Sequence, residues 1–116
     1  MQPEIFRATI LHLTSSDAVQ REAACDTFLA EDEEAVNPLI AEFHAGVSEA
    51  LGVAIINLVG EIGGPDALTL LRYVYHFEEK HLEWHKAARE ALLYNQCNLD
   101  SDELAALEDD DAPDAG

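Results

Sequence analysis

The segment 47–62, VSEALGVAIINLVGEI, constrains the fold of this chain more than any other stretch. Apolar residues recur in it every three or four positions, as they do on one face of an α-helix: Leu51, Ile55, Leu58, Val59 and Ile62. Val53, Ala54 and Ile56 extend the apolar surface well beyond that face. A helix that is apolar nearly all round is usually buried from several sides. We therefore expect this segment to be the central helix of the fold.

Helical patterns occur on both sides of the central segment, and no segment has the pattern of a β-strand. We expect six helices in all, at about residues 3–13, 17–30, 33–45, 47–62, 66–76 and 81–95. Pro38 predicts a late start or a slight kink in the third helix, because proline lacks the N–H that a helix interior uses. In the second helix we expect five residues to face the core: Val19, Ala23, Ala24, Thr27 and Phe28.

The expected helices repeat in pairs. An offset of 32 residues aligns His12, His44 and His76 without a gap. Helix pairs of this length cannot each bury an apolar face alone, but they can when they are stacked. We therefore expect one domain over residues 1–97, with repeats at about 1–32, 33–64 and 65–97. Residues 98–116 are expected to form an acidic tail, with a short helical turn at 101–107 that covers the last repeat, followed by disorder.

The charge of the chain narrows the classes of partner. The sequence has 24 acidic and six basic residues, a net charge of −18, and eight of the acids lie in residues 100–116. Such a surface repels nucleic-acid phosphates and anionic membranes, and it favours a basic or amphipathic protein segment. We therefore expect no nucleic-acid and no membrane partner, while association into a homo-oligomer is left open.

Localisation is predicted from the cysteines and from the apolar runs. Two cysteines, Cys25 and Cys97, do not make a disulfide framework, so we expect reduced thiols and a cytoplasmic chain. The first residues lack the features of a signal peptide. The longest apolar run, 50–60, is too short to span a bilayer.

Three motifs, NPLIAEF, LVGEIGGPDALTLL and KAAREAL, resemble HEAT-like repeats of the short kind named after the phycobilisome lyases. The resemblance covers about residues 1–96, and the Gly-Gly-Pro link and the Ala-Ala pairs are its most specific parts. It implies an all-α fold, a short right-handed α-solenoid of about three HEAT-like helix pairs. It also implies that the second helix of each pair lines an inner, concave surface.

The resemblance implies a function only in outline, because a fold does not decide among activities. HEAT-like repeats mostly bind other proteins, and a minority belong to lyases or metal enzymes. We interpret the chain as a protein–protein interaction or scaffold module without catalysis and without a cofactor. The alternative is a lyase-type or metal-dependent enzyme, or an enzyme subunit, built on the same repeats.

Two histidine patterns bear on the metal alternative. His81 and His85 are four residues apart with Glu78 and Glu83 nearby, but the order HLEWH is not the zinc-protease motif and no third ligand is evident. We therefore interpret this segment as a solvated helix start. The three histidines aligned by the repeat would lie roughly 10 Å apart, the spacing of packed helices, which is too far to share one metal.

The second helices predict a binding surface. Their outward side is expected to carry three rows of aligned residues: Arg21, Val53 and His85; Cys25, Asn57 and Arg89; and Asp26, Leu58 and Glu90. An apolar centre rimmed by polar residues is the usual form of a recognition site. We therefore predict partner contacts at Arg21, Val53, Asn57, Leu58, His85 and Arg89, with Val53 as the anchor. The alternative is that the apolar members pack against neighbouring helices or in a homo-oligomer.

Overall fold

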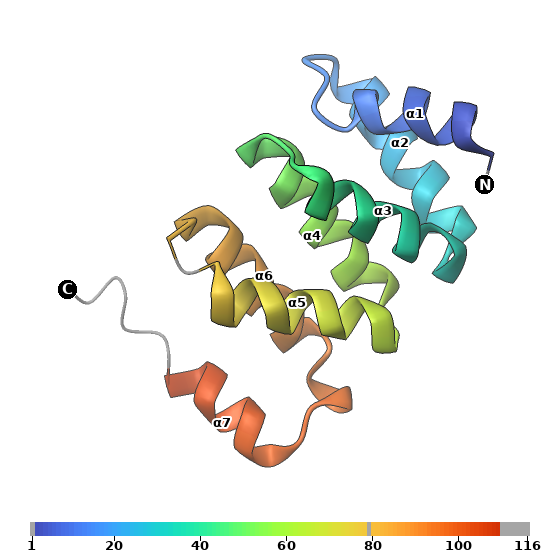
Figure 1. Ribbon diagram of the computed structural model, residues 1–116. Coiled ribbons are helices and arrows are strands. Elements are labelled where there is room, and N and C mark those ends of the chain that lie inside the picture. Colours follow the sequence, from blue (N-terminus) through green and yellow to red (C-terminus); the bar gives the residue numbers. More distant parts are fainter. Residues whose placement is uncertain (1, 79, 110–116) are drawn as a thin grey trace.

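The computed structural model describes residues 2–78 and 80–109, and within these ranges the regular structure is entirely helical (Figure 1). The elements are α1 (Pro3–His12), α2 (Ala18–Glu31), α3 (Glu33–Ala45), α4 (Glu49–Ile62), α5 (Pro65–Phe77), α6 (Leu82–Tyr94), a 3-10 turn (Gln96–Asn98) and α7 (Ser101–Asp109). The prediction of an all-α chain is thereby confirmed for this part of the sequence. None of its helices is long and apolar enough to cross a bilayer.

Local chemistry explains where the helices begin and end. Asp17 caps α2 by accepting a hydrogen bond from the Val19 amide (2.9 Å), and Ser48 caps α4 in the same way. Gly63 and Gly64 have φ angles of +78° and +94°, which only glycine adopts readily, and they make the sharp link between α4 and α5.

The late start, one of the two alternatives expected for α3, does not occur. The helix begins at Glu33, well before Pro38, which lies inside it. Glu33 and Glu34 occupy the first turn, where carboxylates are stabilised by the positive end of the helix dipole. Pro38 costs one hydrogen-bond donor early in the helix, and the favourable first turn offsets that loss.

Consecutive helices pack as three pairs, and the pairs lie one after another along the molecule (Figure 1). One layer contains α1, α3 and α5, and the other contains α2, α4 and α6. The helix α4 lies in the middle and packs against α2, α3, α5 and α6. Its buried residues are Gly52, Ile55, Ile56, Leu58, Val59 and Gly60. The expectation of a central helix is therefore confirmed.

Two glycines let α4 approach α6 closely. A Cβ atom built on Gly52 would lie 2.4 Å from the indole ring of Trp84, and one built on Gly60 would lie 2.6 Å from the Cβ atom of Ala91. Side chains bridge the same contact: the Trp84 indole N–H donates to the Glu49 carbonyl (3.0 Å), and the Asn95 amide donates to the Gly60 carbonyl (2.8 Å). The glycines thus set the separation of the two helices.

The core-facing residues expected for α2 are partly wrong. Ala24 and Phe28 are buried, and Thr27 is half-buried, but Val19 is 73% exposed and Ala23 is also exposed. The reason is position: α2 belongs to the first pair, so no further pair packs on its outer side. Positions equivalent to Ala23 in the later pairs, Ile55 and Ala87, are buried.

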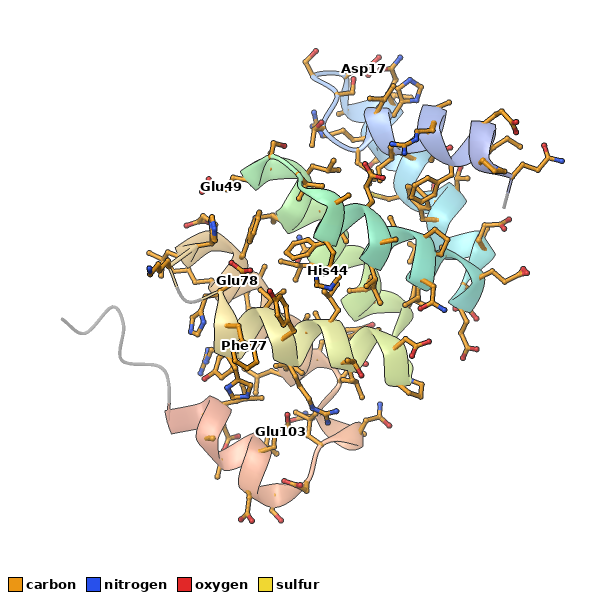
Figure 2. All side chains as sticks on the ribbon, viewed as in Figure 1. Asp17, His44, Glu49, Phe77, Glu78 and Glu103 are labelled. Carbon is orange, nitrogen blue, oxygen red and sulfur yellow. The ribbon has the colours of Figure 1, made fainter. Side chains whose placement is uncertain are left out.

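The last helix, α7, packs against the final pair. Arg72 on α5 makes two hydrogen bonds to the Glu103 carboxylate (2.8 and 3.0 Å), and Arg89 on α6 donates to the Leu107 carbonyl (2.9 Å). Figure 2 shows Glu103 between α7 and α5. Leu107 is only 1% exposed. The expected helical turn over the last repeat is thus present.

The helix α7 is longer than the sequence suggests. It runs to Asp109, whereas Glu108 and Asp109 are expected in the disordered tail. Burial of Leu107 holds the last turn in place, and the next two residues extend it. The rest of the predicted tail, 110–116, lies outside the described residues.

Removing α7 should lower the stability of the fold. A chain ending at Asp100 loses the burial of Leu107, partly offset by the conformational entropy of the ordered helix, so we expect a net loss of about 1 kcal/mol. A chain ending at Asp109 keeps these contacts and should melt like the full chain. Thermal melting followed by circular dichroism measures both, and equal melting of the two truncated chains would contradict the docking of α7.

Candidate functional site

A groove runs between α2 and α4 on the second-helix layer. Its volume is about 650 Å³. Its apolar floor is formed by Leu13, Leu29, Ala54 and Leu58. Its polar rim is formed by Arg21, Glu22, Asp26, Asn57 and Glu61. The groove exists because α4 packs extensively against α6 through its glycines and makes fewer contacts with α2.

A smaller groove, with a volume of about 320 Å³, lies on the other side of α4. It is lined by residues of α4 and α6: Asn57, Gly60, Glu61, Glu90, Ala91 and Tyr94. Asn57 and Glu61 line both grooves, and both side chains are exposed. The exposed stripe of α4 therefore separates two adjacent hollows on one face of the molecule.

The thiol of Cys25 lies in the larger groove and is half-buried. Burial raises the pKa of this thiol, and the nearby carboxylates of Glu61, Asp26 and Glu22 raise the pKa further. A thiol with a raised pKa stays protonated at neutral pH and is a poor nucleophile. The raised pKa thus argues against a reactive cysteine at this position.

The structure brings together three of the six predicted contact residues. Arg21 and Asn57 line the larger groove, and Leu58 forms part of its floor with 3% exposure. Arg21 is itself held by a hydrogen bond that its guanidinium donates to the Ser15 carbonyl (2.7 Å). Partner binding at these positions stays a prediction.

The other three predicted contact residues lie outside both grooves. Val53 is half-buried and packs against the core. His85 stacks on Tyr75 with ring centroids 4.6 Å apart. Arg89 is engaged with the last helix, as described above. The rows predicted from the repeat do not continue across α6, because His85 contacts Tyr75 on α5 and Arg89 contacts Leu107 on α7.

Sequence reasoning missed part of the groove. Glu22, Leu29 and Glu61 line the larger groove but are not among the partner-contact residues that the sequence predicts. The repeat offset contains a signal for them, since it aligns Glu22 with Ala54 and Leu29 with Glu61. Both aligned pairs line the groove. In each pair, one wall carries a glutamate and the other wall carries an apolar residue at the aligned position.

The histidines do not converge on a common point. His81 stacks on Trp84 with centroids 4.2 Å apart and lies 3.6 Å from a Glu78 oxygen, whereas His85 stacks on a different ring. His44, labelled in Figure 2, contacts Tyr73. Over residues 2–78 and 80–109, no group of three or more His, Cys, Asp or Glu side chains is placed to hold a metal ion.

Comparison with protein-family models, with curated proteins and with solved structures finds no match for this chain.

Proposed function

We propose that this chain is a protein–protein interaction module, a short right-handed α-solenoid of about three HEAT-like helix pairs without catalysis. The stacked pairs in two layers and the repeat of 32 residues support this reading. The observation that carries the function is the groove between α2 and α4, with its apolar floor and polar rim.

The chemistry of the groove suits binding better than bond making. Its carboxylates, Glu22, Asp26 and Glu61, are all exposed, so water solvates them. Its thiol, Cys25, has a raised pKa and is therefore weakly nucleophilic. An apolar floor with a solvated rim is the arrangement found where one protein recognises another.

Asn57 offers the sharpest test of this function, because its exposed side chain lies between both grooves. In Asn57→Trp, the larger side chain should occupy space in the two grooves and obstruct a bound segment without disturbing the core. Asn37→Trp is the matched control: Asn37 is also an exposed helical asparagine, but it lies on α3 in the other layer. We expect affinity for a partner to fall at least about tenfold in Asn57→Trp alone, a loss of about 1.4 kcal/mol.

The measurement has two stages. The wild-type protein is first immobilised, and proteins that it retains from an extract of its source are identified by mass spectrometry. The affinity of a retained protein is then measured for the wild type and both variants, after circular dichroism shows that all three are folded. Equal affinities for Asn57→Trp and Asn37→Trp would exclude the face formed by α2, α4 and α6 as the binding site.

A further inference from the structure

The grooves on the layer of α2, α4 and α6, here called the second-helix face, carry four carboxylates without an ion-pair partner among the described residues. Glu22 and Asp26 on α2 and Glu61 on α4 rim the larger groove, and Glu90 on α6 lines the smaller one. Among the described residues, none of these four takes part in an ion pair. The joint influence of Glu61, Asp26 and Glu22 on the pKa of Cys25 shows that three of them act on one point of the groove.

Three of the four arginines of the chain are engaged outside the larger groove, and the rim has three carboxylates to the one arginine that lines it. Arg7 pairs with Glu42, and Arg72 pairs with Glu103. Arg89 is bound to the Leu107 carbonyl, and Arg21, the one basic residue among those that line the larger groove, is bound to the Ser15 carbonyl. A second copy of this chain has a net charge of −18 and would therefore be repelled by an acidic groove. Charge complementarity therefore selects a basic partner of different sequence.

We propose that the groove between α2 and α4 binds a basic amphipathic helix of another protein. The apolar face of the bound helix packs on the groove floor at Leu29, Ala54 and Leu58. The lysines or arginines of the bound helix face the carboxylates of the groove rim. A helix fits because the walls are themselves helices and offer no sheet edge for an extended segment to pair with. Glu22 and Asp26 are four residues apart on α2, the spacing at which basic residues recur on one helix face. This inference rests on the proposed function and names the chemistry of the partner.

Cys25 provides a reporter inside the groove. A bound helix covers this half-buried thiol and slows its alkylation. Cys97, exposed in the 3-10 turn, provides an internal control whose alkylation rate stays unchanged. The two rates are separated by mass spectrometry of the digested protein.

The test uses two fluorescent model peptides of about 18 residues, long enough to form a helix in the bound state. Both have the same leucine stripe, and the polar positions are lysine in one peptide and glutamate in the other. Fluorescence anisotropy measures the Kd of each. We expect the lysine peptide to bind at least about tenfold tighter than the glutamate peptide and to slow alkylation of Cys25 but not of Cys97. Equal protection of both cysteines, or of neither, would overturn the assignment to this groove.

Two triple variants separate the groove from the overall negative charge. The groove variant is Glu22→Gln/Asp26→Asn/Glu61→Gln, and the control is Glu34→Gln/Asp102→Asn/Glu108→Gln, which removes equal charge from exposed positions outside the groove. Three rim pairs together contribute about a tenfold change in Kd, so we expect that loss in the groove variant and under twofold loss in the control. Equal losses in the two variants would mean attraction to bulk charge and would overturn the proposal.

The outcomes also distinguish this inference from the proposed function. A natural partner that is lost in Asn57→Trp but retained by the groove triple variant would leave the interaction function standing and exclude a basic helix. Circular dichroism checks that each variant is folded. The single variant Glu61→Gln, at an exposed position on α4, provides a second measurement if a triple variant melts early.

Discussion

Replacing Ile55 with alanine should lower the free energy of unfolding by about 2–5 kcal/mol, the usual loss for truncating a buried aliphatic side chain. Ile55 is fully buried, and its helix packs against four others. The cavity left by the substitution is walled by several helices at once, so it cannot collapse easily. Chemical denaturation measures the loss.

Val53→Ala serves as the control for this prediction. Val53 is on the same helix but is half-buried, so its truncation removes less buried surface. We expect a clearly smaller loss than for Ile55→Ala. Similar losses for the two variants would show that the apolar face of α4 is assigned incorrectly.

Gly60→Ala should destabilise the fold by roughly 1–3 kcal/mol, the cost of overpacking, although alanine favours helices more than glycine does. The added methyl group would meet the Cβ atom of Ala91, so α4 and α6 would have to move apart. The contact through Trp84 at Gly52 lies on the same interface and would be strained by that movement. Thermal and chemical denaturation of the variant measure the cost.

A double variant tests whether the clash with Ala91 causes the destabilisation of Gly60→Ala. Gly60→Ala combined with Ala91→Gly moves the methyl group from one side of the interface to the other. Glycine in α6 costs about 1 kcal/mol in helix propensity, but the clash is removed. We expect the double variant to be more stable than the sum of the single effects predicts, by at least about 1 kcal/mol. Strict additivity would show that the clash is not what destabilises Gly60→Ala.

Local sequence rules predicted most helix boundaries because the signals act within a few residues. The Asp17 and Ser48 caps and the link at Gly63 and Gly64 depend on backbone groups next to them in the chain. Pro38 does not delay the start of α3, because the loss of one hydrogen-bond donor is small beside the favourable charges of Glu33 and Glu34 in the first turn.

The exposure of residues on the second helices was predicted less well, because exposure depends on which helices meet. Val53 is partly covered, while Ala23 is uncovered because α2 lies at the end of the stack. The repeat treats the three second helices as equivalent, but α4 approaches α6 through Gly52 and Gly60 and leaves the groove on the side of α2. The unequal spacing of α2, α4 and α6 results from side-chain packing, and an alignment of repeats does not predict it.

The two ends of the stack differ, and this difference predicts a gradient of local opening. The last pair packs against α7, and each of its helices, α5 and α6, has five buried residues. Within α1 and α2 the buried side chains are Ile10, Ala24 and Phe28, fewer than α4 alone contains. Amide hydrogens of α1 and α2 should therefore exchange with solvent faster than those of α4 and α6.

Because α2 is also one wall of the groove, opening of the first pair would dismantle the groove. A segment bound between α2 and α4 would oppose that opening by mass action. Binding of a segment in the groove would then slow amide hydrogen exchange in α1 as well, although α1 lines neither wall of the groove. Because the first pair lies at the uncovered end of the stack, local opening of α1 and α2 is thus coupled to binding in the groove.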